Sequence, residues 1–137
     1  MQGNDITQSF NFLRSIRGIG GKIASFYLRD LVVVINVNLI NVRSRELLQP
    51  IDVWVERTVK ILTGNPNMNI MQVANWVVTN SHQYSLNPEY INMGIWFFCA
   101  SIVKSEYRLK QSLANINIAR ALINDFRSSL SNTCQNC

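Results

Sequence analysis

The sequence predicts an all-α fold of about six helices, and two observations support this prediction. Apolar residues recur three and four positions apart along most of the 137 residues, which is the spacing of helices with one buried face. Glycine and proline number only six and three, and no alternating apolar and polar stretch of useful length indicates a strand. We expect one helical domain over residues 1–130 and a flexible tail over residues 131–137.

The first two predicted helices flank a glycine-rich turn. We expect one helix from about residue 5 to 16, a turn over residues 17–21, and a second helix from there to about residue 41. Residues 32–35 are β-branched, which lowers helix propensity, but they continue the helical spacing of the apolar residues before them. The whole segment, residues 6–41, is therefore interpreted as a helix-hairpin-helix.

A polar, charged loop over residues 43–49 precedes the third predicted helix. Pro50 stands just before that helix and Asp52 lies near its start, where a carboxylate is a favoured cap. The stretch Gly64-Asn65-Pro66-Asn67 combines strong turn residues and ends the helix.

Capping patterns mark the beginnings of the next helices. Asn69, followed three residues later by Gln72, predicts the start of a fourth helix that runs to about residue 81. Asn87-Pro88-Glu89 places a cap, a proline at the first helical position and an acid in the first turn, and predicts a fifth helix. The apolar residues expected on its buried face are Ile91, Ile95, Phe98 and Ile102. The last helix is expected over residues 106–130.

The net charge of +5 is unevenly distributed along the chain. Residues 14–60 hold eight basic and four acidic residues, and residues from 104 onward hold five basic and two acidic ones. Between them, residues 61–103 contain no Lys or Arg, and Glu89 is the one charged residue. This pattern is typical of a core flanked by surfaces that face phosphates, although an ordinary basic protein explains it as well.

Nothing in the sequence indicates a membrane segment or a secretion signal. Apolar runs such as residues 31–35 are far shorter than a membrane span, and residues 1–5 lack the basic and apolar regions of a signal peptide. We therefore expect a cytoplasmic protein without a membrane partner.

The glycine-rich turn has the composition of a phosphate-binding hairpin. Its glycines permit positive backbone angles and remove side chains that would block a close approach, while Ile19 anchors the turn in the core. The amides that open the next helix then form an anion site. The residues expected to contact DNA are Arg14, Arg17, Gly18, Ile19, Gly20, Gly21 and Lys22. The alternative is a glycine-rich connection that binds no ligand.

The stretch from Ile16 to Lys22 resembles the hairpin of the helix-hairpin-helix DNA glycosylase superfamily, in which the glycine pattern is followed by Lys. The run from Pro50 to Val55 resembles that superfamily's second signature, a proline, a hydrophobic residue and Asp that open a helix. The 30-residue separation of Lys22 and Asp52 is closest to the archaeal 8-oxoguanine DNA glycosylase branch.

The resemblance implies a base-excision repair enzyme that acts on an oxidised purine in double-stranded DNA. Lys22 would be the nucleophile that forms a Schiff base, and Asp52 the essential carboxylate. The hairpin begins within twenty residues of Met1, whereas the family carries helices upstream of it. The chain therefore resembles the carboxy-terminal portion of such an enzyme, whose fold an upstream segment or a second chain would complete.

The chemistry of base excision explains why an amine and a carboxylate would be needed. Positive charge develops on the sugar as the base leaves, and a carboxylate such as Asp52 stabilises it. An amine such as Lys22 attacks C1′ and permits strand cleavage by β-elimination. The flipped base needs an aromatic pocket. The available aromatic residues are Tyr27, Trp54, Trp76, Trp96 and Phe97, most of which we expect in the core, and Trp54 and Tyr27 are the candidates for the pocket.

Non-catalytic roles are the alternative interpretation of these residues. Lys22 could merely contact a phosphate, and Asp52 could merely cap a helix. The chain would then be a non-catalytic DNA-binding module, a remnant of a glycosylase, or a helical assembly subunit. Cys134 and Cys137 have metal-ligand spacing, but three cysteines do not make an iron–sulfur site, and we expect no metal and no cofactor. The two tail thiols could instead form a local disulfide.

Overall fold

The computed structural model describes residues 6–35 and 44–134, with side chains described up to residue 131. Every regular element within these ranges is helical, which confirms the predicted all-α class. The elements are α1 (Thr7–Ser15), α2 (Gly21–Ile35), the 3-10 turn η1 (Arg45–Leu48), α3 (Val53–Thr63), α4 (Ile70–Gln83), α5 (Pro88–Phe97), the π-helical turn η2 (Phe98–Val103), α6 (Glu106–Ala114) and α7 (Ile116–Cys134). The predicted extension of the second helix to residue 41 lies outside the described residues.

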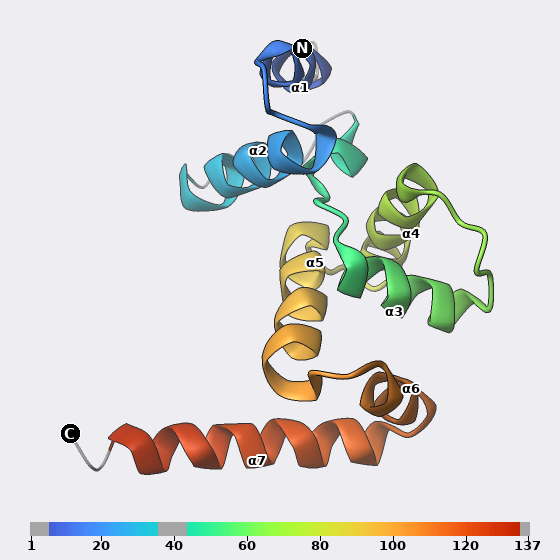
Figure 1. Cartoon of the computed structure of the whole chain (residues 1–137), viewed down its shortest axis with the longest axis vertical. Coiled ribbons are helices and arrows are strands. Elements are labelled where there is room, and N and C mark those ends of the chain that lie inside the picture. The colour runs from blue at the N-terminus through green and yellow to red at the C-terminus, as the bar shows by residue number, and fades with distance from the viewer. Residues whose placement is uncertain (1–5, 36–43, 135–137) are drawn as a thin grey trace.

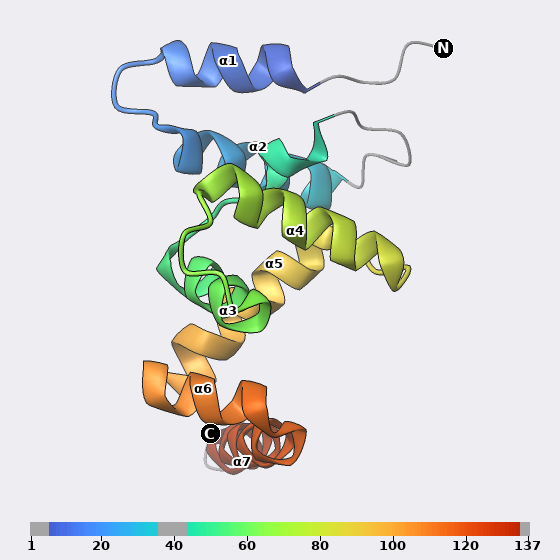
Figure 2. The ribbon, with the colours of Figure 1, turned by 90° about the vertical axis from the view of Figure 1, so that its right-hand side faces the viewer.

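The helices are arranged around α5, which runs through the middle of the molecule (Figure 1). The pair formed by α1 and α2 lies at one end of α5, and the pair formed by α6 and α7 lies at the other (Figures 1 and 2). Helices α3 and α4 pack against α5 between these ends. No helix within the described ranges combines the length and apolar character that crossing a bilayer requires.

Side-chain caps begin the helices where the capping patterns predicted them. Asp52 Oδ1 accepts hydrogen bonds from the backbone N–H groups of Trp54 (3.0 Å) and Val55 (2.9 Å) and caps α3. Asn69 and Gln72 form the reciprocal capping box that opens α4. Such caps satisfy donors that have no partner inside the helix, which is why these boundaries could be located from the sequence.

The predicted last helix is two helices instead of one, so the estimate of about six helices was too low. Asn115 leaves the helical conformation (φ −142°, ψ 109°) and its side-chain oxygen accepts from the backbone N–H of Asn117 at 3.0 Å. Asn competes with the helix through such local hydrogen bonds, and here it ends α6 and begins α7. Residues 131–134, predicted to belong to a flexible tail, continue α7, while residues 135–137 lie outside the described ranges.

The carboxy-terminal end of α5 widens into the π-helical turn η2. The turn ends at Lys104, which adopts a left-handed conformation (φ 61°) and donates its N–H to the Cys99 carbonyl at 2.8 Å. The predicted fifth helix continued smoothly through Phe98 and Ile102. Periodicity detected the apolar face but not the extra residue in the turn, and π turns of this kind occur often near functional sites.

A buried ion pair fixes η1 against the start of α5. Arg45 donates to both carboxylate oxygens of Glu89, from Nε to Oε1 at 2.8 Å and from Nη2 to Oε2 at 2.6 Å. The Glu89 side chain is fully buried, and Gln49 Nε2 donates to the same Oε1 at 3.2 Å. This two-point contact holds the segment that leads into α3 beside α5, and that segment carries Asp52.

Candidate functional site

One of the three glycines in the turn between α1 and α2 adopts a left-handed backbone conformation. Gly18 has a positive φ of 91°, and the N–H of Ile19 donates to the carbonyl of Ile16 at 3.0 Å. The side chain of Ile19 packs against the buried cluster of Phe10, Ala24, Leu28 and Leu48, which anchors the turn. Helix α2 begins at Gly21, directly after this turn, and the positive end of a helix is a place where an anion can bind.

The surface at the two glycines that precede α2 is open, whereas Gly21, which opens the helix, lies against the Phe10 ring. A Cβ atom added at Gly18 or Gly20 would meet no atom within 4 Å, and both glycines are exposed. Arg14, Arg17 and Lys22 are exposed as well, and the Arg14 guanidinium lies 5.8 Å from the centre of the Phe10 ring. Cations and open glycine backbone thus occur together on one short segment.

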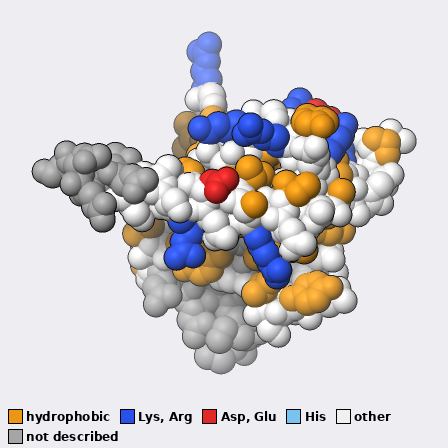
Figure 3. Space-filling model, turned by 90° about the horizontal axis from the view of Figure 1, so that it is seen from below, with side chains coloured by type: hydrophobic (Ala, Val, Ile, Leu, Met, Phe, Trp, Pro, Cys, Tyr) orange, Lys and Arg blue, Asp and Glu red, His pale blue; other side chains and the backbone are white. Residues whose placement is uncertain are grey.

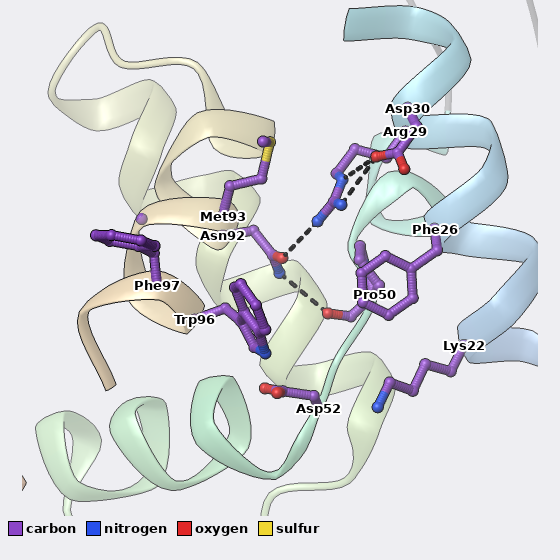
Figure 4. Close-up of a pocket in the computed structure, with 11 residues that line it drawn as sticks. Lys22, Phe26, Arg29, Asp30, Pro50, Asp52, Asn92, Met93, Trp96 and Phe97 are labelled. Atoms are coloured by element: carbon purple, nitrogen blue, oxygen red, sulfur yellow. Dashed lines mark hydrogen bonds and ion pairs between the residues drawn. The ribbon is translucent and has the colours of Figure 1, made fainter. Parts of the chain in front are cut away.

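A pocket with a volume of about 590 Å³ lies beside the hairpin, between α2, α5 and the segment that enters α3 (Figure 4). It contains both residues predicted to be catalytic. Its lining residues are Lys22, Phe26, Arg29, Asp30, Pro50, Asp52, Asn92, Met93, Gly94, Trp96 and Phe97.

One wall of the pocket is a face of α2. Lys22, Phe26 and Arg29 are four and three residues apart, so they project from the same side of the helix. The Phe26 ring lies between two cations: its centre is 5.8 Å from Lys22 Nζ and 4.8 Å from Arg29 Cζ. Such contacts hold both cations near the ring and favour a fixed orientation for the wall.

Asp52 has a structural role and faces the pocket at the same time. Its side chain is largely buried, and its described hydrogen bonds, which cap α3, all use Oδ1. Figure 4 shows its carboxylate and the Lys22 ammonium at the same end of the pocket. No ion pair joins Lys22 to Asp52, although both lie in the described ranges, so a group bound between them could contact each one.

Asn92 on α5 forms hydrogen bonds to residues of the other two walls of the pocket. Its Nδ2 donates to the Pro50 carbonyl at 3.3 Å, and its Oδ1 accepts from Arg29 Nη1 at 3.5 Å (Figure 4). Arg29 also donates from Nε and Nη2 to Asp30 Oδ1, at 3.0 and 2.8 Å. Since Arg29 and Asn92 are both buried, these polar groups are paired with one another, and the pairing holds α2, α5 and the Asp52 segment in register.

Aromatic rings from α5 form the opposite wall. Trp96 follows Asn92 by four residues and projects from the same face of the helix, and Phe97 lies next to it. The Phe97 ring makes an edge-to-face contact with Phe126 of α7, with ring centres 5.7 Å apart. Helix α7 therefore supports the pocket from behind.

Neither of the two residues predicted for the base pocket lines the pocket that holds Lys22 and Asp52. Trp54 packs against the buried cluster of Cys99, Val103 and Leu109, beneath the Arg57 guanidinium, and does not line the pocket. Tyr27 points away on the exposed side of α2. Tyr27 lies on the same helix as Lys22, and Trp54 lies on the helix that Asp52 caps, but their side chains project from other faces of these helices.

The aromatic residues that do line the pocket could be found only in part. Phe26 and Arg29 lie four and seven positions after Lys22, so helical spacing alone connects them to it. Asn92 and Trp96 come from a distant helix, and no pattern in the sequence relates α5 to α2.

The described cysteine lies outside this pocket. Cys99 is buried, and burial raises the pKa of its thiol, a hydrogen bond with Thr58 partly offsets this, and the nearby Asp52 carboxylate raises the pKa further. Among the described residues, no three His, Cys, Asp or Glu side chains gather as metal ligands would. The Cys134 side chain and all of Cys137 lie outside the described part of the chain.

The chain is similar to a known protein over nearly its whole length. An uncharacterized protein of Methanocaldococcus jannaschii, MJECL21, is 24% identical over 170 residues, a match that covers 97% of this chain and 39% of the relative. The chain thus spans about two-fifths of that relative's length, and the relative's description names no activity. No protein-family model matches the chain, and no solved structure matches it.

Proposed function

We propose that the pocket is the active site of a DNA glycosylase with AP lyase activity that removes an oxidised purine, of the 8-oxoguanine type, from double-stranded DNA. The observation that supports this most is the meeting of Lys22 and Asp52 in one pocket from positions thirty residues apart. The predicted chemistry needs these two groups over the same sugar, and an accidental pair of a phosphate-binding lysine and a helix cap has no reason to share a cavity.

The proposed reaction assigns one step to each group. The deprotonated amine of Lys22 attacks C1′, the bond from C1′ to the base breaks, and the base leaves with the bonding electron pair and takes up a proton. The Asp52 carboxylate stabilises the positive charge that develops on the sugar. The sugar ring opens to a Schiff base on Lys22, and loss of the C2′ proton then expels the 3′ phosphate.

The rest of the pocket suits a flipped base. Phe26 and Trp96 present ring faces and edges on opposite walls, as a planar heterocycle requires for stacking. The Arg29 guanidinium lies beside Phe26 on the α2 wall and offers donors to carbonyl oxygens of a purine.

The hairpin supports the binding of DNA next to the pocket. Lys22 is at once the second residue of α2, beside the amides that open the helix, and a residue of the pocket wall. A backbone phosphate bound at these amides would place the neighbouring sugar close to Lys22 without reading any base. Arg14 and Arg17 add positive charge that attracts the backbone.

A second function, a non-catalytic helix-hairpin-helix module or glycosylase remnant that binds DNA without excision, is favoured by one observation. The Oδ1 atom of Asp52 caps α3, so this residue has a structural purpose even without a reaction. In this function Lys22 would contact phosphate only.

Borohydride trapping separates the two functions. A duplex with one 8-oxoguanine is incubated with the protein and sodium borohydride, which reduces a Schiff base to a stable covalent adduct. We expect an adduct with the wild type, none with Lys22→Gln, and an undiminished one with Lys110→Gln, a matched change on α6 outside the pocket. DNA binding without an adduct on 8-oxoguanine or an abasic site would overturn the enzyme and leave the binding module.

A further inference from the structure

A second cavity, with a volume of about 880 Å³, is lined by side chains of α3, α4, α5, α6 and α7. Gly94 of α5 borders both this cavity and the first pocket, and the two share no other lining residue. Lys22 and Asp52, to which the proposed function assigns the reaction, do not line the second cavity. Its ligand can therefore be inferred without the proposed function.

The lining of this cavity is uncharged and largely apolar. No Asp, Glu, Lys, Arg or His is among its described lining residues, and four of these residues are aromatic: Trp76, Tyr84, Tyr90 and Phe98. An ionic group placed here would lose its hydration and find no opposite charge, which opposes its binding. Aromatic side chains pack well against other rings. The lining therefore favours an uncharged ligand with an aromatic ring system.

Several large side chains that line the cavity are open to solvent. Tyr84 is 69% exposed, Tyr90 is 57% exposed and Leu86 is 49% exposed. Figure 3, which views the molecule from the α7 end, shows hydrophobic side chains exposed on this face as well. A molecule seated in the cavity would remove part of this apolar surface from water, which is favourable. The volume also lies within the range of about 300–1,000 Å³ that is typical of small-molecule sites.

One polar group in the lining lacks a hydrogen-bond partner. Ser81 is 3% exposed, and its Oγ is one of two buried side-chain polar atoms without a partner in the described part of the chain. The neighbouring polar groups are occupied: Thr58 Oγ1 donates to the Trp54 carbonyl at 2.8 Å, and Asn80 Nδ2 donates to the Trp76 carbonyl at 2.9 Å. A buried hydroxyl without a partner is unfavourable. Rotation about one side-chain bond would let the Ser81 hydroxyl meet a group bound in the cavity.

We propose that this cavity binds an uncharged aromatic molecule with a carbonyl group, and that Ser81 Oγ donates a hydrogen bond to the carbonyl oxygen. The ring system of the ligand lies against the apolar and aromatic lining. The carbonyl supplies the one partner that Ser81 lacks in the free protein. An aromatic molecule of similar size without a carbonyl leaves Ser81 unpaired, so it binds less tightly.

The dye Prodan tests this proposal, because it is an uncharged naphthalene with a carbonyl group whose fluorescence shifts to the blue in an apolar site. Titration of the wild-type protein should give a saturable blue shift with one site per chain. Ala119 lines the cavity, so Ala119→Trp should abolish the shift. Ala121→Trp is the matched control, because Ala121 is an exposed residue of the same helix outside the lining, and it should leave the shift unchanged.

Circular dichroism checks that both tryptophan variants keep their helices. The absence of a saturable shift with the wild type would overturn the proposal. A shift that Ala119→Trp leaves undiminished, or that the folded Ala121→Trp variant loses equally, would overturn it as well.

The substitution Ser81→Ala tests the hydrogen bond separately. It removes the unpartnered hydroxyl, so the free energy of unfolding should not fall, whereas the Kd for Prodan should rise about fivefold, the effect of one neutral hydrogen bond. The affinity for 2-methylnaphthalene, which has no carbonyl and is measured by displacement of Prodan, should be the same in the wild type and in Ser81→Ala.

Ser112→Ala is the matched control for Ser81→Ala. Ser112 is also 3% exposed, but it lies outside the cavity lining and its Oγ donates to the Arg108 carbonyl at 2.8 Å. Ser112→Ala should bind Prodan as the wild type does. Equal affinities of Ser81→Ala and the wild type for Prodan would overturn the proposal, and so would an equal loss of affinity for 2-methylnaphthalene.

Discussion

Asp52 caps α3 with one oxygen and lines the same pocket as Lys22, although thirty residues separate the two in sequence. The cap explains how the carboxylate keeps its place without an ion pair: two backbone N–H groups hold it, so the lysine does not have to. Lys22 is held by the first turn of α2 and by its contact with the Phe26 ring. The two charged groups are therefore positioned independently and remain available to a ligand.

The two roles of Asp52 can be separated by substitution. Asp52→Asn keeps a cap of similar strength and removes the charge, so we expect the free energy of unfolding to stay within about 0.5 kcal/mol of the wild type while excision is lost. Asp52→Ala removes the cap as well and should lower the free energy of unfolding by about 1 kcal/mol more than Asp52→Asn does. Urea unfolding measures the stability of each variant, and an excision assay measures its activity. Full excision by Asp52→Asn would remove the carboxylate from the mechanism.

The hairpin can be blocked without unfolding the protein. Gly20 is exposed, and an added Cβ meets no atom within 4 Å, so Gly20→Val should fold with unchanged helical circular dichroism. Its side chain would stand where a phosphate approaches, and we expect DNA affinity to fall by about tenfold or more, that is by at least about 1.4 kcal/mol. Gly20→Ala, with its smaller side chain, should lose less DNA affinity than Gly20→Val. Normal binding by Gly20→Val in a fluorescence anisotropy titration would contradict the phosphate site.

Removing one partner of the buried ion pair between Arg45 and Glu89 should destabilise the protein strongly. The Arg45 and Glu89 side chains are 16% and 0% exposed, so Arg45→Met leaves a carboxylate buried without its partner and should cost about 3–5 kcal/mol. The double variant Arg45→Met with Glu89→Met should recover most of that loss, because no buried charge remains. Denaturant unfolding of Arg45→Met, Glu89→Met and the double variant gives the coupling energy of the pair. Equal losses of stability in Arg45→Met and the double variant would contradict a buried pair.

Alkaline conditions should reveal the burial of Cys99. Because burial raises the pKa of this thiol above its ordinary value of 9.0, the unfolded chain loses the thiol proton first as the pH rises. The contribution of Cys99 is therefore fully present below about pH 9 and declines as the pH rises towards the folded pKa. Comparing the free energies of unfolding of the wild type and Cys99→Ala at about pH 8 and about pH 10 isolates this effect. A difference that does not shrink with pH would contradict it.

Local chemistry made parts of this fold predictable. The caps at Asp52, Asn69 and Asn87 and the turn at Gly18 rest on neighbours within three residues, so the sequence contains all the information they need. The break at Asn115 is also local, but periodic apolar residues on both sides of it concealed the cap.

The candidate site depends on contacts that no local pattern encodes. Asn92 could not be assigned to the pocket because its partners, Pro50 and Arg29, are 42 and 63 residues away in sequence. Glu89 fits the pattern of an acid in a first helical turn, yet it is buried by Arg45, which lies 44 residues before it. The resemblance to a glycosylase motif related Lys22 to Asp52 and gave no information about the rings around them.

The most direct test of the central claim is to locate the amine that becomes attached to DNA. After borohydride reduction of the protein with a duplex that contains 8-oxoguanine, digestion and tandem mass spectrometry identify the modified peptide. We predict a single adduct on the Nζ of Lys22, formed by the wild type and absent from Asp52→Asn when the base is intact. An adduct on another lysine or on the amino terminus, or none at all, would contradict the proposed active site.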